Sequence, residues 1–322
     1  MKALVPELRP AGLCAVVQGD SVGELPAGVR PRRRPVAAGV TRALLGAVPV
    51  PGVDLFHGLD VDIPWRAGAV RVSTVHDLSV LDVPWVSGRM RARGESALVR
   101  HALRNADVLL AVSDFTAERI RAVSGRAATV IGLAPASWAV PPDPAQVERV
   151  RRRYRLPSRF VLQVGTVDPR KAVGLVAEAT ASLDVPCVLA GAGSTGPGAP
   201  AGVIGLGYVP VADLPALYAS ATVTAYASRY EGYGLPPVEA MACGGAVVAS
   251  AVGALPDVVG RGAVLVDALR VQDWSAALRT VMSEPQARAE LVEGGMAAAA
   301  ELSWARTARL TAHAYRDAGV NW

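Results

Sequence analysis

Two glutamates, Glu231 and Glu239, lie eight positions apart around a glycine-rich loop. The loop follows an apolar, strand-like run, 222–227, and precedes a helix-like segment, 236–243, with proline in its first turn. Ligands of α/β proteins bind at the carboxyl ends of parallel strands, and a helix N-terminus offers free N–H groups that suit a phosphate. The carboxylates can accept hydrogen bonds from hydroxyl groups, one set on a sugar ring and the other on a ribose.

Two adjacent cations, Arg170 and Lys171, end a second segment that reads FVLQVGTVDPRK. This pattern predicts a buried strand, then a turn at Gly165 and Thr166, then the start of a helix. Cationic side chains at a strand-to-helix turn favour binding of a diphosphate. Only two residues of this arginine-rich chain are lysines, so a lysine at this turn is an independent hint of function.

Two histidines stand at the ends of strand-like runs in the first part of the chain. His76 follows an apolar run in the letters VHDLS, and His57 ends the run 54–57. A single histidine is often structural. We expect His76 to act on the ligand, and His57 either to be structural or to face the acceptor.

The letters EGYGLPPVEAMACG resemble the donor motif of the retaining glycosyltransferases of family 4, which have the two-domain GT-B fold. The resemblance implies that Glu231 contacts the donor sugar and Glu239 holds the ribose. His76, in a segment similar to the family's HD motif, then faces the sugar from the other domain. On this basis we expect His76 and Glu231 to be the catalytic residues.

The same resemblance supplies the donor-binding residues. Its diphosphate loop corresponds to the turn before Lys171, and its nucleobase-reading segment corresponds to 203–221. The expected donor-binding residues are Gly165, Thr166, Arg170, Lys171, Tyr208, Val209, Gly232, Tyr233, Gly234, Leu235 and Glu239.

Short apolar runs alternate with helical patterns through most of the chain, which predicts an α/β fold with parallel sheets. Together with the resemblance, this predicts two Rossmann-like domains that face each other across a cleft. We expect an N-terminal acceptor-side domain at 1–145 and a nucleotide-sugar-binding domain at 146–302. The last segment, 303–322, resembles the family's closing helix and is expected to cross back to the first domain.

The first domain is expected to be short by about one βα unit. Family members begin with a strand, a glycine-rich loop and a long helix, and no such loop occurs before residue 35. Either the chain starts late or this unit was lost. We expect the run 12–18 to form a strand inside the first sheet, with 4–8 as a remnant helix or arm.

Composition excludes several classes of protein. The net charge is +5 and 31 of the 33 basic residues are arginine, but they are dispersed and no aromatics are interleaved to stack bases, so we expect no nucleic acid partner. No apolar run is long enough to cross a membrane. Three separated cysteines indicate a reducing compartment, and the histidine spacing indicates no metal site.

The sequence therefore predicts retaining, metal-independent transfer of a hexose or deoxyhexose from a nucleoside-diphosphate sugar, without a cofactor. The acceptor is left open as a glycan, a lipid-linked molecule or a small molecule. We expect a cytoplasmic protein, with peripheral membrane contact through the arginine-rich segments 32–34 and 149–155. The alternative is a non-catalytic glycosyltransferase-like protein. A nicotinamide-dependent enzyme is disfavoured because no G-x-G-x-x-G follows a strand.

Overall fold

The computed structural model describes residues 4–8, 14–18, 25, 27, 29–34, 52–65, 68–86 and 89–320. The chain divides into two compact units: unit 1 is Met1–Leu133 with Ser303–Trp322, and unit 2 is Ala134–Leu302. The division falls ahead of the expected boundary at residue 145, because the stretch before helix α6 (Pro144–Arg153) packs with unit 2.

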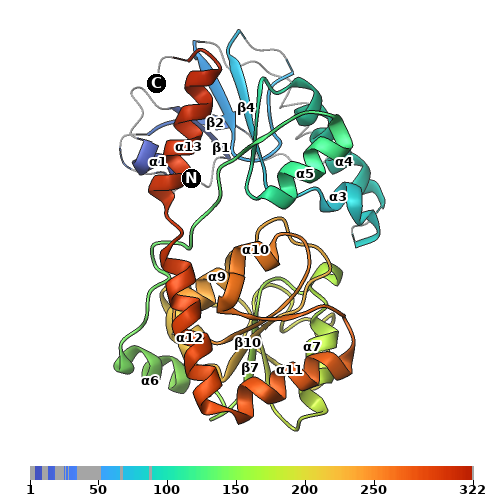
Figure 1. Cartoon of the computed structure of the whole chain (residues 1–322), viewed down its shortest axis with the longest axis vertical. Coiled ribbons are helices and arrows are strands. Elements are labelled where there is room, and N and C mark those ends of the chain that lie inside the picture. The colour runs from blue at the N-terminus through green and yellow to red at the C-terminus, as the bar shows by residue number, and fades with distance from the viewer. Residues whose placement is uncertain are drawn as a thin grey trace. The chain divides into compact units, whose positions relative to one another are not determined.

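Unit 2 contains a six-stranded parallel sheet (Figure 1). Most of its strands are short apolar runs, as the sequence predicts. The exception is β9, a two-residue strand that the sequence does not indicate. The strands are β7 (Val161–Val164), β8 (Cys187–Ala190), β9 (Ile204–Gly205), β10 (Val223–Tyr226), β11 (Val247–Ser250) and β12 (Val264–Val266).

The strand order, β12-β11-β10-β7-β8-β9, places the first strand of unit 2 at the centre of the sheet. From β7 the chain moves outward through β8 and β9, and then returns to the other side of β7 at β10. The direction of winding therefore reverses between β7 and β10. This reversal is the point at which doubly wound α/β sheets bind ligands, beyond the carboxyl ends of the strands.

Helices cover both faces of this sheet, because neighbouring residues of each strand point to opposite sides. In β7, Leu162 joins a core with helices α6, α8 (Leu214–Ser220), α9 (Leu235–Ala242), α10 (Leu255–Val259) and α12 (Pro285–Ala300). Val161 joins the opposite core, with α7 (Val173–Ala181) and α11 (Val271–Ser283). Trp274 of α11 is fully buried there. Burial of an apolar side chain of this size stabilises the fold by about 2–3 kcal/mol.

Unit 1 contains a second parallel sheet, in the chain order β3-β4-β5-β6. Helix α13 (Trp304–Asp317), from the end of the chain, packs on it through Tyr315 and Ala314. The other elements are β3 (Leu55–Gly58), β4 (Val70–Val75), α3 (Ser79–Asp82), the 3-10 turn η2 (Pro84–Val86), α4 (Arg89–Asn105), β5 (Val108–Ala111), α5 (Asp114–Ser124) and β6 (Thr129–Val130).

The expected place of the run 12–18 is wrong. Strand β1 (Cys14–Gln18) pairs in parallel with β2 (Arg30–Arg34), and these two form a separate sheet among the described residues. Pairing with β2 gives partners to the backbone groups along one edge of β1. The expected remnant at 4–8 is a helix, α1 (Leu4–Leu8), which contacts α13.

Candidate active site

The loops after β7 and β10 meet at the switch point of the unit 2 sheet, and they bring Glu231 against Arg170 and Lys171. One carboxylate oxygen of Glu231, Oε1, lies 2.9 Å from Nη1 of Arg170 and 2.5 Å from Nζ of Lys171. Ser228 Oγ and Tyr226 OH also donate to this oxygen, at 2.8 and 3.1 Å. Three residues that the two sequence motifs placed separately therefore form one charged cluster.

This cluster is buried. Glu231 is 6% exposed, and the side chain of Lys171 is 13% exposed. Burial lowers the pKa of Lys171, while the neighbouring Glu231 carboxylate opposes that shift. Buried charges persist only when they are paired and hydrogen-bonded. Glu231 thus supplies the anion that pairs with both cations.

Tyr226 is an additional member of the cluster that the sequence motifs do not single out. Its hydroxyl accepts a hydrogen bond from Nζ of Lys171, and the same ammonium lies 4.4 Å from the centre of its ring. Burial and the nearby Glu231 raise the pKa of Tyr226 well above its usual value, so the phenol stays protonated. Tyr226 is the last residue of β10, and a strand-end tyrosine is ordinary enough that no sequence signal marks it.

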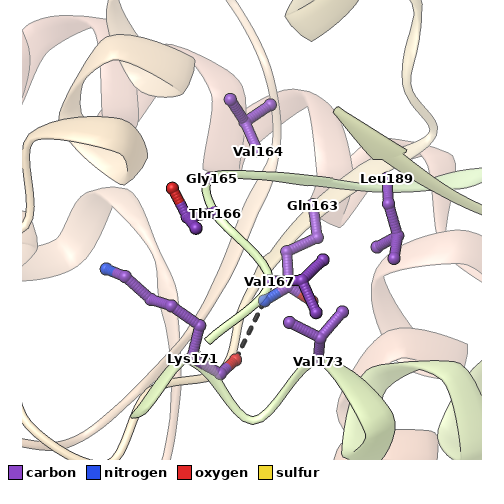
Figure 2. Close-up of a pocket in the computed structure, with 8 residues that line it drawn as sticks. All are labelled: Gln163, Val164, Gly165, Thr166, Val167, Lys171, Val173 and Leu189. Atoms are coloured by element: carbon purple, nitrogen blue, oxygen red, sulfur yellow. Dashed lines mark hydrogen bonds between the residues drawn. The ribbon is translucent and has the colours of Figure 1, made fainter. Parts of the chain in front are cut away.

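A pocket lies beside this cluster, at the turn that follows β7 (Figure 2). Gly165, Thr166 and Lys171 contribute to its lining. Gly165 has φ 144°, and a Cβ built on it would meet no atom within 4 Å, so the backbone here is open to a ligand. The turn is braced by Gln163, whose Nε2 donates to the carbonyl oxygen of Lys171 at 3.0 Å.

Gly234, in the loop before α9, is required by the packing of the protein. Its φ is 103°, and a Cβ built on it would lie 2.4 Å from Cδ2 of Leu255. Its expected contact with the donor stays a prediction. The neighbouring expected donor-binding residues Gly232 and Tyr233 are also buried, and Leu235 begins α9.

Glu239 lies on α9, one turn beyond its start, and differs from Glu231 in its surroundings. Burial raises the pKa of the Glu239 carboxyl to about 7. No cation pairs with it in the described part of the chain, whereas Glu231 has two. A carboxyl in this state is ready to gain hydrogen-bond donors, such as the hydroxyl groups of a ribose.

Tyr208 and Val209 follow the edge strand β9. The side chain of Tyr208 is 80% exposed, and that of Val209 is 5% exposed. Val209 belongs to the core that includes α8 and α9. The buried Val209 anchors this segment to the core, and a contact with a nucleobase here stays a prediction.

The two histidines of unit 1 have different surroundings. His57 is held at both ring nitrogens, with Nδ1 2.5 Å from Tyr315 OH and Nε2 2.7 Å from Thr74 Oγ1. Burial lowers the pKa of His57 to about 3. His76 is exposed at the end of β4, and its Nε2 donates to the carbonyl oxygen of Leu59 at 2.8 Å. The geometry makes His57 a structural residue and leaves His76 accessible. His76 lies in unit 1 and Glu231 in unit 2. The expectation that both residues contact the same sugar therefore stays a prediction.

Known glycosyltransferases are similar to this chain in sequence. Residues 146–297, nearly all of unit 2, match the family described as Glycosyl transferases group 1. The chain is 33% identical over 282 residues to the O-antigen chain mannosyltransferase B of Escherichia coli, which covers 81% of this chain and 74% of that protein. It is 31% identical over 284 residues to the D-inositol 3-phosphate glycosyltransferase of Actinosynnema mirum, covering 80% and 67%.

Solved structures agree on the fold. WaaG, a glycosyltransferase involved in lipopolysaccharide biosynthesis, superposes with a TM-score of 0.72 at 15% identity, over 96% of this chain and 91% of that one. Anabaena Alr3699/HepE in complex with UDP and glucose gives a TM-score of 0.70 at 20% identity, over 88% and 85%.

The parallel sheets and the structural neighbours define a glycosyltransferase of the GT-B class. The chain belongs to the glycosyl transferases group 1 family, and it is a transferase. The alternative of a non-catalytic protein with this fold therefore has no observation in its favour.

Proposed function

We propose that this enzyme transfers a hexose, with retention of anomeric configuration, in the manner of the family 4 glycosyltransferases. The observation that supports this most directly is the cluster of Glu231, Arg170 and Lys171 beside the open turn at Gly165. Its cations lie where a diphosphate reaches the switch point, and its carboxylate can accept the hydroxyl groups of the attached sugar.

Charge on the leaving diphosphate has to be stabilised as the bond to the sugar breaks. Arg170 and Lys171 can do this, and we propose that they do so without a metal ion. Arg170 is already fixed in place, because its Nη1 also donates to the carbonyl oxygen of Tyr230 at 2.8 Å. A preorganised cation costs little to align when the transition state forms.

The donor sugar is narrowed by the relatives. Several of them are named as mannosyltransferases, so we propose mannose as the first hexose to test, with deoxyhexoses second. The acceptor stays open between a glycan, a lipid-linked molecule and a small molecule. We also propose a cytoplasmic location, because Cys187 and Cys243 are free and buried, as thiols are in a reducing compartment.

Donor hydrolysis across a panel of nucleotide sugars tests this function. We expect GDP-mannose or a GDP-deoxyhexose to be hydrolysed slowly in the absence of acceptor, and to raise the melting temperature more than UDP-glucose does. Activity should persist in EDTA. Once an acceptor is found, the anomeric proton coupling of the product reports the stereochemistry, and an inverted product would contradict the retaining mechanism.

A further inference from the structure

The two carboxylate oxygens of Glu231 have different surroundings. All four hydrogen-bond donors contact Oε1, and Oε2 accepts no hydrogen bond from the residues that the structure describes. Two of the donors are the cations Arg170 and Lys171, and two are the neutral hydroxyl groups of Tyr226 and Ser228. A carboxylate with one oxygen fixed and the other open can accept a hydroxyl group of a ligand through the open oxygen.

The two cations have a second task when a donor binds. In the proposed function, Arg170 and Lys171 contact the diphosphate, and each hydrogen atom given to a phosphate oxygen is no longer available to Glu231. Glu231 is 6% exposed, so water cannot fully replace the lost donors. The carboxylate then depends more strongly on the hydroxyl groups of Tyr226 and Ser228.

The hydroxyl group of Ser228 is shared between several acceptors. Its Oγ lies 2.8 Å from Oε1 of Glu231. It also lies 3.2 Å from the carbonyl oxygens of both Arg170 and Tyr230. A serine hydroxyl has a single hydrogen, so it can serve only one of these acceptors well at a time.

The hydroxyl group of Tyr226, in contrast, has one acceptor among the described residues. It accepts a hydrogen bond from Nζ of Lys171, so its own hydrogen is directed to Oε1 of Glu231, 3.1 Å away. The side chain is 1% exposed and belongs to the core that includes α8 and α9. Strand β10 and this core therefore fix the hydroxyl in place as a donor to Glu231.

We propose that Tyr226 is a positioning residue of the transferase reaction, which holds the Glu231 carboxylate while the diphosphate engages Arg170 and Lys171. The Tyr226 hydroxyl fixes Oε1, and Oε2 is presented to a hydroxyl group of the donor sugar. The aromatic ring lies 4.4 Å from Nζ of Lys171 and keeps the ammonium beside the carboxylate. Tyr226 has this role only if the proposed function holds, because the cations must bind the diphosphate and Glu231 must contact the sugar.

The variant Tyr226→Phe removes the hydroxyl group and keeps the ring. Calorimetry compares its affinity for GDP with its affinity for GDP-mannose, or for the nucleoside diphosphate and nucleotide sugar that the donor panel identifies. We expect GDP affinity to match wild type, because the cations and the ring are retained. Nucleotide-sugar affinity and turnover should each fall roughly tenfold, since a hydrogen bond to a charged group is lost. Wild-type values of both would overturn the proposal.

The matched control is Tyr218→Phe. Tyr218 lies in the same core and is fully buried, and its hydroxyl has no hydrogen-bond partner in the described part of the chain. This variant should keep wild-type GDP affinity, nucleotide-sugar affinity and turnover. Equal losses in Tyr226→Phe and Tyr218→Phe would show a general response of the core to the loss of a buried hydroxyl, and the positioning role would be wrong.

A double-mutant cycle tests whether Tyr226 acts through Glu231. In a Glu231→Ala background, Tyr226→Phe should cause no further loss of nucleotide-sugar affinity relative to GDP, because no carboxylate is left to hold. The same further loss in both backgrounds would show that Tyr226 acts independently of Glu231, against the proposal. Melting curves establish that every variant is folded. Wild-type protein that neither binds nor hydrolyses any nucleotide sugar would overturn the proposed function, and this role of Tyr226 with it.

Discussion

The carboxyl ends of the parallel strands hold candidate functional residues in both units, but the two units hold them differently. In unit 2, the carboxylate of Glu231 after β10 accepts from four side chains and is almost fully buried. In unit 1, His76 after β4 is exposed and is held by one hydrogen bond to a carbonyl oxygen.

This difference has a physical cause. A buried charge requires partners whether or not a ligand is bound, so the cluster of Glu231, Arg170 and Lys171 is fixed in the free enzyme. An exposed histidine has water as a partner and needs no such network. Nucleotide binding to unit 2 should therefore not depend on His76. A change at His76 should affect turnover alone.

The largest effect is expected from Glu231→Ala. Turnover should fall by about 1,000-fold or more if the carboxylate orients the sugar, and the free energy of unfolding should fall by about 3 kcal/mol because two buried cations lose their anion. The same loss frees Arg170 and Lys171, so the affinity for the nucleoside diphosphate should be unchanged or higher. Kinetics, urea unfolding and calorimetry measure the three quantities.

The control for this variant is Glu178→Gln, on the exposed part of α7. This variant should leave turnover, the free energy of unfolding and nucleotide affinity unchanged. A large loss of nucleotide affinity in Glu231→Ala would mean that Glu231 binds the nucleotide itself. The proposed role of Glu231 in orienting the sugar would then be wrong.

The second largest effect is expected from the double variant Arg170→Ala with Lys171→Ala, and it concerns nucleotide binding. We expect nucleoside diphosphate affinity to fall by about 100-fold or more, because two charge-assisted contacts are lost. The free energy of unfolding should also fall, since Glu231 is left buried without a cation. Removal of two exposed cations would leave it unchanged. Unchanged affinity in calorimetry would remove both cations from the diphosphate site.

The third prediction sets the two histidines of unit 1 against each other. His76→Ala should lower turnover by about 100-fold while leaving the melting temperature unchanged. His57→Gln should do the reverse, with a loss of about 1–3 kcal/mol as the hydrogen bonds to Thr74 and Tyr315 are disturbed. If His57→Gln abolishes turnover without changing stability, the structural role of His57 is wrong.

The pH dependence of unfolding checks His57 independently. Its pKa in the folded protein is about 3, below the ordinary value of 6.5, so the unfolded chain binds a proton first as the pH falls. Stability from this group is fully present above pH 6.5 and is lost progressively toward pH 3. The His57→Gln variant should lose less stability than wild type over that window.

The smallest effect concerns Glu239. Its folded pKa of about 7 lies above the ordinary value of 4.5, so burial of the charged form costs stability as the pH rises from 4.5 to 7. Ribose hydroxyls favour the charged form, so nucleotide affinity should rise about tenfold between pH 6 and pH 8 relative to Glu239→Gln. Calorimetry on both proteins cancels the titration of the diphosphate itself. Parallel pH profiles would remove Glu239 from the ribose site.

Much of unit 2 was predictable because its signals are local. The runs that became β7, β10 and β11 are apolar and end at glycine or polar residues. The chemistry of the two motifs was also visible, since a loop at a strand end followed by a helix needs no long-range information.

Other elements carried no local signal. Strand β2 reads RPRRR, and charge with proline fits only an exposed edge, where pairing is decided by the neighbour β1. The partner of β1 was therefore not predictable, and its expected place in the larger sheet was wrong.

By itself, the sequence determined the class of fold, the order of the elements and which residue types stand at the strand ends. These follow from periodicity and turn chemistry along the chain. Only the tertiary structure decided which charges meet: Glu231 neutralises Lys171 from 60 residues away, and Asp213 neutralises Arg149 from 64. Electrostatic energy depends on distance in space and on burial, and neither can be read from a list of residues.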